Sequence, residues 1–341
     1  GEGFRMAKKY GHRLKPLYIL DIIRRKSDEA HPITAAVICK ELENYGITAE
    51  RKSVYSDIAA LEEYGYDIIK SANPKGWFLG SREFEEPEVY LLADAVRSAK
   101  FISASKTAGI INKLDGFLSE GQRAKREKRV YFSANSKCSN EEIFYSIDCI
   151  SEAIQTGVKI EFDYISRVLS PERELVKQSR HMKISPYALT WQDDHYYVIG
   201  NYEKYDNLIH LRLDRMHSVR QTKEKSRHFS LVSKYSDRFD VSDYTSGLFS
   251  MYGGKLCTVT LCCKKSVIEQ AADRFGENIF IKNVTEDEFC FSVDAALSDA
   301  LVTWIISYGD KIRVVSPKEL IDMTVLRAEE VLKIYSCGEK K

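Results

Sequence analysis

The alternation of apolar and polar positions predicts a set of short strands in the middle of the chain. Three successive segments, 184–191, 195–202 and 208–213, alternate in this way and are separated by polar turns. Segment 159–164 alternates as well, and 173–183 is a further candidate for a strand. Together these segments predict a small, strongly bent antiparallel sheet or barrel.

The last of these strands separates two kinds of side chain. Leu211 and Leu213 point to one face, while His210, Arg212 and Asp214 point to the other, because successive residues of a strand alternate. A strand with one apolar face and one face of His and Arg predicts the wall of an anion-binding pocket. The alternative is a solvated face on which an arginine pairs with Asp214 at the surface.

The N-terminal part of the chain, residues 10–80, has the pattern of three helices and a hairpin. Apolar spacing predicts helices over about 14–26, 35–45 and 51–64. Two short strands around a turn rich in Asn, Pro and Gly predict a hairpin over 67–79. This order of elements indicates a winged helix-turn-helix.

The remaining segments predict an α+β protein. Residues 84–157 are mostly helical in pattern and would form a linker that offers a dimerisation surface, with a solvated basic stretch at 122–129. Residues 217–253 predict an irregular, partly helical connector. Residues 254–336 follow the order βαββαβα, which indicates a ferredoxin-like α+β domain.

The charge balance argues for local rather than general nucleic-acid binding. The 341 residues include 51 Lys and Arg against 50 Asp and Glu, so the chain is not a polybasic coat for nucleic acid. Residues 1–26 are an exception, with eight basic side chains against two acidic ones. Any nucleic-acid contact is therefore expected to come from a local patch.

The spacing of the cysteines and the absence of catalytic motifs predict a non-enzymatic, cytoplasmic protein. The eight cysteines show no C-x-x-C spacing and no pattern of a disulfide framework, which suits a reducing compartment. No signal peptide or apolar run of membrane-spanning length is evident. Motifs for hydrolases, zinc proteases and nucleotide-binding loops are missing. His195 beside Asp193 and Asp194 could suggest a metal site, but a polar hairpin turn explains it better. We expect no metal and no cofactor.

Several of these segments resemble one family. The run 196–200, Tyr-Tyr-Val-Ile-Gly, with Ser185-Pro186-Tyr187 before it and 211–216, Leu-Arg-Leu-Asp-Arg-Met, after it, resembles the WYL domain of bacterial transcription regulators. The signature letters Trp-Tyr-Leu are replaced here by Tyr196-Tyr197-Val198, which keep the aromatic-aromatic-aliphatic character. The resemblance implies an Sm-like β-barrel over 158–216 that binds an effector.

Segments in the N-terminal and C-terminal parts of the chain also resemble this family. The stretch 51–68, RKSVYSDIAALEEYGYDI, resembles the recognition helix of the same regulators, and 76–79 resembles their wing. Residues 304–309 and 316–320 resemble the WCX extension that commonly follows a WYL domain. The resemblance therefore covers nearly the whole chain, with the three modules in order.

The resemblance and the strand faces together suggest an effector site. The family's pocket pattern of Ser, Tyr, His and two Arg corresponds to Ser166, Tyr164, His181, Arg212 and Arg215. His210 is a rival to His181, and Lys183 is a second candidate for the cation. Tyr187 shares a strand face with Lys183 if the strand is regular. Arginine forks, tyrosine rings and hydroxyls suit an anionic ligand with flat rings, such as a nucleotide or single-stranded nucleic acid.

A second set of residues is expected to contact operator DNA. Its members are basic or hydroxyl-bearing and lie at the start of the third helix, in the first helix or in the wing. They are Arg13, Arg51, Lys52, Ser53, Tyr55, Ser56, Lys70 and Lys75. Arg13, Lys70 and Lys75 would contact phosphates, whereas Ser53, Tyr55 and Ser56 are better placed for base edges. The alternative is a charged, solvated helix face.

The sequence thus predicts a homodimeric, ligand-responsive transcription regulator. Its winged helix-turn-helix would bind a double-stranded operator, and its WYL domain would bind an anionic effector. Two copies would match a palindromic site. The alternative is a nucleic-acid-binding accessory protein of a defence nuclease complex of the CRISPR type, which would use the WYL pocket but no operator.

Overall fold

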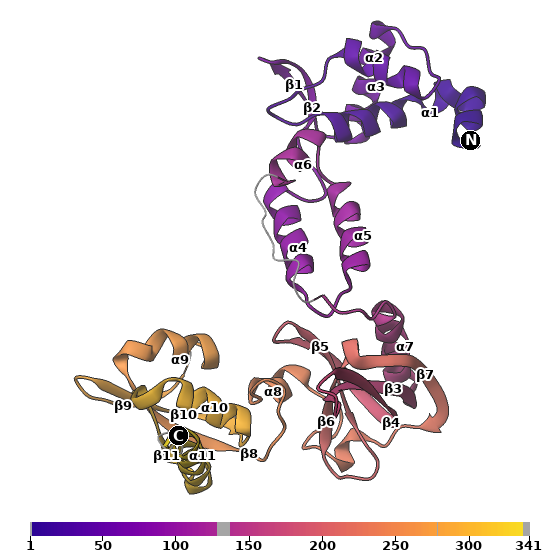
Figure 1. The fold of residues 1–341 in the computed structure, drawn as a ribbon. Coiled ribbons are helices and arrows are strands. Elements are labelled where there is room, and N and C mark those ends of the chain that lie inside the picture. Colours follow the sequence, from indigo (N-terminus) through magenta and orange to yellow (C-terminus); the bar gives the residue numbers. More distant parts are fainter. Residues whose placement is uncertain (1, 128–136, 278, 337–341) are drawn as a thin grey trace. The chain divides into compact units, whose positions relative to one another are not determined.

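The computed structural model describes residues 2–127, 137–277 and 279–336, which form a mixed α/β protein with several antiparallel sheets. The chain divides into two compact units, residues 1–141 and 142–341. Figure 1 shows the elements of each unit, coloured along the sequence. Each unit is described by itself below.

The first unit begins with three helices and a hairpin, in the expected order. The helices are α1 (Glu2–Lys26), α2 (Ala35–Asn44) and α3 (Arg51–Tyr64). Strands β1 (Ile68–Ala72) and β2 (Lys75–Leu79) pair antiparallel as the hairpin. Fourteen buried apolar side chains from all five elements and their connections share one core.

The segment between α1 and α2 is joined to the hairpin by an isolated β-bridge, which the sequence pattern did not reveal. Ile33 and Trp77 exchange two backbone hydrogen bonds, with N–O distances of 2.8 and 2.9 Å. A Cβ atom on Gly76 would lie 2.8 Å from the Ile33 carbonyl oxygen, so only glycine permits this close approach. The hairpin is therefore fixed to the helices through backbone contacts.

Three further helices complete the first unit: α4 (Glu86–Ser98), α5 (Ala104–Asp115) and α6 (Glu120–Glu127). The expectation that 122–129 is a solvated basic stretch is wrong at Arg126. Its side chain is only 3% exposed and donates a hydrogen bond of 2.7 Å to Asp115 Oδ2. A buried guanidinium requires such a carboxylate, and the spacing of charges along the chain did not indicate that α5 would supply one. Residues 128 and 129 lie outside the described ranges.

The second unit begins with α7 (Ile143–Thr156), the last helix of the predicted linker. Its buried side chains include Ile143, Ile150 and Ala153. Glu152 accepts a hydrogen bond of 2.7 Å from the side chain of Gln221, which lies in β7 (Met216–Lys225). This helix therefore packs on the sheet that follows it.

Five strands form that sheet, in the order β6-β5-β4-β3-β7. Their bounds are β3 (Val158–Leu169), β4 (Leu175–Gln192), β5 (His195–Asn201), β6 (Leu208–Arg212) and, as above, β7. Within the described residues β6 and β7 remain at opposite edges and do not pair, so the expected barrel is not closed. The segment 217–225, which was expected to be irregular, is part of β7 and pairs with β3.

The 18-residue strand β4 explains the bend of this sheet. Residues 175–184 pair with β3, whereas 185–192 pair with β5. The segments 173–183 and 184–191, which alternate separately in sequence, are thus one strand shared by two halves of the sheet. The register of β4 against β5 shifts between Pro186 and Ala188, next to the point where β4 changes partner.

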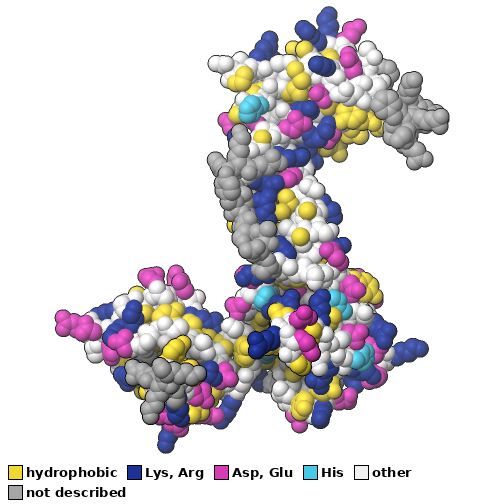
Figure 2. Space-filling model, in the orientation of Figure 1, with side chains coloured by type: hydrophobic (Ala, Val, Ile, Leu, Met, Phe, Trp, Pro, Cys, Tyr) yellow, Lys and Arg dark blue, Asp and Glu magenta, His cyan; other side chains and the backbone are white. Residues whose placement is uncertain are grey.

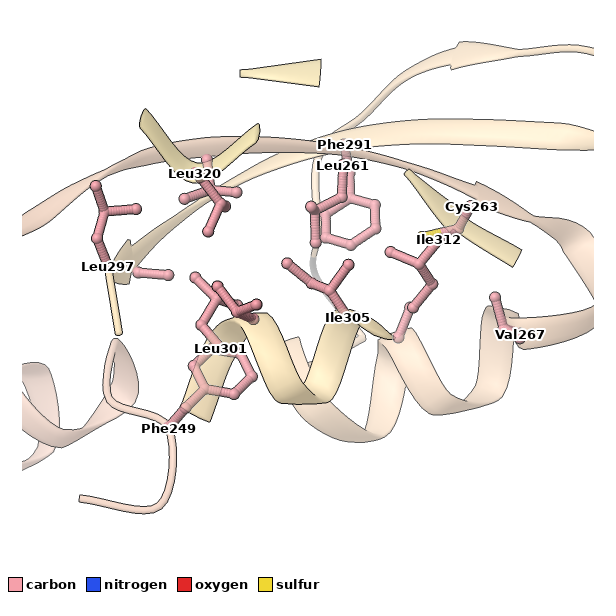
Figure 3. Close-up of a cluster of buried hydrophobic side chains, with 14 of the residues drawn as sticks. Phe249, Leu261, Cys263, Val267, Phe291, Leu297, Leu301, Ile305, Ile312 and Leu320 are labelled. Carbon is pink, nitrogen blue, oxygen red and sulfur yellow. The ribbon is translucent and has the colours of Figure 1, made fainter. Parts of the chain in front are cut away.

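The C-terminal part follows the expected order βαββαβα. Its elements are β8 (Leu256–Lys264), α9 (Ile268–Phe275), β9 (Ile281–Val284), β10 (Glu288–Ala296), α10 (Asp299–Ser307), β11 (Ile312–Ser316) and α11 (Lys318–Ser336). The strands form an antiparallel sheet in the order β11-β8-β10-β9. Figure 3 shows the buried core of this part, in which Leu301 and Ile305 of α10 lie close to Leu261 and Phe291 of the sheet.

Two cysteines of this sheet contradict the expectation from spacing. Cys262 on β8 and Cys290 on β10 are directly opposite in the register and form a disulfide. They are 28 residues apart in sequence, and only strand pairing brings them together. Spacing patterns cannot show such a pair, because the number of residues between two strands does not determine their register.

Candidate effector cavity and nucleic-acid-facing surface

A cavity of about 1080 Å³ lies beside β6 in the second unit, and we call it the β6 cavity. One wall comes from the sheet and includes Tyr164, Tyr197 and residues 208–212. The other wall comes from residues 232–256, the connector between the two sheets. The cavity opens to solvent, so a ligand can enter without unfolding of either wall.

Four of the eight predicted effector residues line the β6 cavity. They are Tyr164, His210, Arg212 and Arg215. They come from β3, from β6 and from the short 3₁₀ turn Leu213–Arg215 that links β6 to β7. All five residues of β6 line the cavity, Leu211 included, so the lining does not follow the alternation expected for this strand.

The other four predicted effector residues lie outside this cavity. His181 pairs with Asp163 directly across the β3–β4 ladder, with Nδ1 3.1 Å from Oδ1, and Lys183 pairs with Glu224. The Ser166 hydroxyl donates to the Gln178 carbonyl oxygen at 3.5 Å. The Tyr187 hydroxyl donates to the Arg227 carbonyl oxygen at 2.8 Å. His181 and Lys183 belong to the half of β4 that pairs with β3, whereas Tyr187 lies in the half that pairs with β5 and Ser166 lies on β3.

Arg212 is held in place by the carboxylate two residues after it. Its Nε and Nη2 donate to Asp214 Oδ1 and Oδ2 at 3.0 and 2.7 Å. This hydrogen bonding raises the pKa of Arg212 above its usual value, although burial acts in the opposite direction. The bidentate contact fixes the plane of the guanidinium beside the cavity.

His210 gives the cavity a partly buried imidazole. Its Nε2 lies 2.9 Å from the hydroxyl of Tyr244 on α8 (Val241–Ser246). Burial lowers the pKa of His210, and a hydrogen bond to the Met251 backbone opposes this only in part. Burial also raises the pKa of Tyr244 to about 12. Both groups are therefore neutral near pH 7 and offer hydrogen bonds rather than charge.

The cations that line the cavity differ in how they are paired. Lys234 lies 2.7 Å from Asp243, which also accepts a hydrogen bond from the Tyr235 hydroxyl at 2.6 Å. In the part of the chain that the structure describes, neither Arg215 nor Lys255 has an ion-pair partner, and both side chains are exposed. These two cations are available to an anionic ligand.

The connector wall, which the sequence did not indicate as part of the site, is anchored to the C-terminal sheet. The backbone of Ala296 donates to Gly247 at 2.8 Å, and that of Leu297 donates to Lys255 at 3.0 Å. The guanidinium carbon of Arg274 lies 3.9 Å from the centre of the Phe249 ring. Figure 3 shows Phe249 reaching into the core of the C-terminal part. A ligand in the β6 cavity would therefore touch the first sheet and a segment fixed to the second.

The first unit carries the predicted DNA-contacting residues on exposed positions. Val54, Ile58 and Leu61 bury one face of α3. The other face of α3 exposes four of the residues that were predicted to contact DNA. The other exposed residues of this set lie in α1 and the hairpin. The exposed residues are Arg51, Lys52, Tyr55, Ser56, Arg13, Lys70 and Lys75. Figure 2 shows basic side chains among acidic and apolar ones on the visible surface of this unit.

Two of the predicted DNA-contacting residues also have structural contacts. The Ser53 hydroxyl accepts a hydrogen bond from Lys15, whose Nζ lies 2.8 Å from Asp57. The Tyr55 ring packs edge-on against Trp77 of the hairpin, with ring centroids 5.0 Å apart. Ser53 is therefore partly engaged within the protein, whereas Tyr55 joins the face of α3 to the hairpin.

The described residues contain no group of three or more His, Cys, Asp or Glu side chains arranged to hold a metal ion. The pattern around His195 that suggested a metal site is a hairpin turn, in which Asp193 and Asp194 have positive φ angles of 48° and 60°. None of the described helices is long and apolar enough to cross a membrane.

Comparison with protein families identifies the two halves of the second unit. A family model of the WYL domain matches residues 146–221, and a model of the WCX domain matches residues 255–332. The chain thus contains a WYL domain followed by a WCX domain. The WYL match includes most of α7 and ends within β7, so both elements belong to this domain.

The comparisons with individual proteins are less informative. Among solved structures, the chain is similar to proteasome accessory factor B/C (PafBC) of Arthrobacter aurescens at 15% sequence identity and a TM-score of 0.26. The similarity covers 94% of this chain and 46% of PafBC, so the chain spans about half the length of that protein. No curated protein matches the chain.

Proposed function

We propose that this protein is a homodimeric transcription regulator that responds to an anionic effector. The N-terminal helices and hairpin act as a winged helix-turn-helix on operator DNA. The bent WYL sheet, which is Sm-like in this proposal, and the ferredoxin-like WCX domain form the sensor. The presence of WYL and WCX domains in one chain supports this assignment of roles.

The β6 cavity is the observation that carries the sensor role. It brings Tyr164 of β3 together with His210, Arg212 and Arg215, which lie on β6 and the 3₁₀ turn directly after it. Converging cationic and neutral donors in one cavity are what an anionic ligand requires, whereas solvated surface residues would diverge. The pairing of Arg212 with Asp214 does not remove this role, because it orients the guanidinium toward the site.

The cavity chemistry favours a ligand with both negative charge and flat rings. Arg215 and Lys255 supply unpaired positive charge at exposed positions of the lining. Tyr164, Tyr197 and Tyr252 supply aromatic surface, on which bases can stack. With a volume of about 1080 Å³, the cavity has room for a nucleotide or for a short piece of single-stranded nucleic acid.

The exposed face of α3 supports DNA binding by the first unit. Arg51 and Lys52 lie at the helix N-terminus, where the backbone N–H groups also favour phosphate. Tyr55 and Ser56 follow on the same exposed side and can reach base edges. One such unit contacts only a few base pairs, so two copies on a palindromic operator provide sufficient affinity.

A population shift couples the two activities in this proposal. The two walls of the β6 cavity belong to different sheets, and the connector wall is anchored by Ala296 and Leu297. A ligand that bridges the walls stabilises one arrangement of WYL and WCX relative to the others. The coupling free energy equals the difference in ligand-binding free energy between the arrangements. It is typically about 1–3 kcal/mol.

The test is selection of duplexes from a random-sequence pool by the full-length chain, followed by competition with nucleotides and single-stranded oligonucleotides. The proposal expects one enriched palindromic motif, and binding to it that changes when effector is added. Tight binding of single strands with no enriched duplex would favour the accessory role in a defence nuclease complex instead.

A further inference from the structure

The hairpin of β3 and β4 extends past the rest of its sheet as a two-stranded ribbon. The two strands pair continuously up to Leu169 opposite Leu175. Within the described residues, β7 pairs with β3 only as far as Tyr164, and β5 pairs with β4 only from Ser185 onward. Residues 165–180, which we call the ribbon, thus have a strand neighbour on one side only.

An ordered turn closes the end of the ribbon. The Ser170 backbone N–H donates to the Glu174 carbonyl oxygen at 2.8 Å, and that of Arg173 donates to the Ser170 carbonyl oxygen at 3.0 Å. Hydrogen bonds from its own backbone N–H and from the Ser170 hydroxyl lower the pKa of Glu172. The turn therefore holds the register of the two strands and engages one of its own carboxylates.

The ribbon carries an excess of positive charge, although the chain as a whole is nearly balanced. Its acidic residues are Glu172 and Glu174, whereas its basic residues number four, all of them exposed: Arg167, Arg173, Lys177 and Arg180. The ion pairs elsewhere in this sheet are made by Lys159, Lys183 and Arg220. In the part of the chain that the structure describes, the four ribbon cations have no ion-pair partner and can meet an external anion.

Two of these cations lie directly opposite each other. Arg167 on β3 is the register partner of Lys177 on β4. Like charges in this position destabilise a strand pair. Charge on an open strand edge deters unwanted pairing, but a pair of opposite charges would do so equally well and would also stabilise the ribbon. Edge protection therefore does not account for two positive charges, whereas a bound polyanion does.

The other side chains of the ribbon favour duplex DNA over a single strand. A two-stranded ribbon fits the major groove, where phosphates flank the apolar methyl groups of thymine. Leu169 and Leu175 lie on the same face as Arg167 and Lys177, and are 68% and 74% exposed. The ribbon has no aromatic residue, so it lacks the stacking surface on which single-strand binding depends.

An anionic membrane surface is a poorer partner for the same ribbon. The two leucines flank the turn, so their insertion into the apolar layer would carry Glu172 and Glu174 with them. Burial of these carboxylates in an apolar layer would be costly. Contact along the side of the ribbon, as in a DNA groove, leaves both carboxylates in water.

We propose that the ribbon is a second contact of this protein with duplex DNA. Arg167 and Lys177 bind phosphates, and Leu169 and Leu175 touch the groove between them. Phosphate contacts carry no sequence information, so the ribbon adds affinity for any duplex. The inference goes beyond the proposed function and does not depend on operator recognition, because the ribbon belongs to the WYL domain, which also contributes residues to the β6 cavity.

The chain offers a matched pair of variants for the test. Arg167→Glu removes the like-charge pair and places a carboxylate opposite Lys177, so the ribbon itself should be at least as stable as before. Lys225→Glu makes the same change in net charge on β7, at an exposed residue opposite Val158 at the other end of β3. Circular dichroism and thermal unfolding of the full-length chain will verify that both variants fold.

Fluorescence anisotropy with a mixed-sequence duplex, at salt concentrations from about 50 to 200 mM, gives the decisive measurement. The unchanged chain and Lys225→Glu should bind alike. Arg167→Glu should bind about tenfold more weakly, and its salt dependence should fall by about two units of slope, because Lys177 is then paired and two phosphates are no longer neutralised. Equal binding by the two variants, or no duplex binding by the unchanged chain at the lowest salt, would overturn the inference.

Two further probes identify a different partner. A single-stranded oligothymidine of equal length and vesicles of phosphatidylserine are titrated with the same samples. If Arg167→Glu weakens binding to either of these and leaves duplex binding as it is, the ribbon does not serve duplex DNA.

The outcome is distinguishable from that of the proposed function. The same comparison is repeated in a chain that also carries Arg51→Ala and Lys52→Ala, where the effect of Arg167→Glu should persist. If no operator is selected but Arg167→Glu still loses duplex affinity, operator recognition fails and the ribbon contact remains. If an operator is selected but the ribbon variant binds as Lys225→Glu does, only the ribbon contact is removed.

Discussion

The guanidinium of Arg212 and the carboxylate of Asp214 form a bidentate pair at the edge of the β6 cavity, with distances of 3.0 and 2.7 Å. The Asp214 side chain is only 10% exposed, so this is not a fully solvated surface pair. Arg212 and Asp214 therefore stabilise each other. Removal of Arg212 should affect protein stability, whereas removal of the unpaired Arg215 should not. This difference leads to the first prediction.

Arg215→Ala should weaken effector binding about tenfold, a loss of about 1.4 kcal/mol, and leave the thermal midpoint nearly unchanged. Arg215 is exposed and has no ion-pair partner among the described residues. Arg212→Ala should weaken binding as well, but should also cost about 1–3 kcal/mol of stability because Asp214 loses its guanidinium partner. Titration of each variant with a nucleotide or a single-stranded oligonucleotide, beside urea unfolding, measures both effects. Equal stability of the two variants would show that the pair is not structural.

Lys255 tests whether the connector wall takes part in ligand binding. Lys255→Ala should weaken the binding of an anionic effector several-fold, and the loss should shrink as salt is raised because the side chain is exposed. Lys265→Ala is the matched control, since Lys265 is also exposed but lies outside the cavity lining. If the two variants bind the effector alike at low salt, the ligand does not reach the connector wall.

The partly buried imidazole of His210 predicts a loss of stability in mild acid. Burial lowers its pKa below the ordinary value of 6.5, so below about pH 6.5 the unfolded chain binds a proton that the folded chain does not. The contribution of His210 is therefore intact above this pH and declines as the pH falls toward its folded value. Urea unfolding at pH 7.5 and 5.5 should show a smaller pH effect for His210→Gln than for the unchanged chain.

The disulfide between Cys262 and Cys290 should stabilise the C-terminal domain. It closes a loop with a sequence separation of 28 residues, for which chain entropy predicts roughly 3–4 kcal/mol. The double variant Cys262→Ser with Cys290→Ser should lose about this much, and a reducing agent should have a similar effect on the unchanged chain. Denaturant unfolding with and without reductant measures both. If reductant changes nothing, the two thiols are not joined in the protein in solution.

The proposed DNA-binding surface of α3 is tested by charge removal at its start. Arg51→Ala with Lys52→Ala should lower operator affinity and reduce the salt dependence by about two units of slope, one for each phosphate that the variant no longer neutralises. Both side chains are exposed, so the stability of the first unit should not change. Lys113→Ala on α5, also exposed, should leave the slope as it is. An unchanged slope in the double variant would place the DNA-binding surface elsewhere.

Much of the local structure followed from the sequence, because it depends on neighbouring residues. The burial of Val54, Ile58 and Leu61 on one side of α3 follows directly from their helical spacing. The order of strands and helices in the C-terminal part followed in the same way. The expected strand at 208–213 is found as β6, although all five of its residues line the cavity rather than alternate ones.

The rest depended on which segments meet in three dimensions, and no local pattern contains that information. Pairing of β4 first with β3 and then with β5 placed His181 and Lys183 away from the cavity. Strand register alone brought Cys262 to Cys290. Anchoring by Ala296 and Leu297 turned an irregular connector into the second wall of the site. The sequence by itself determined the elements and the direction of their side chains, because these arise from backbone geometry over a few residues. Tertiary structure decided which side chains share a cavity, because long-range pairing is set by the packing of the whole domain.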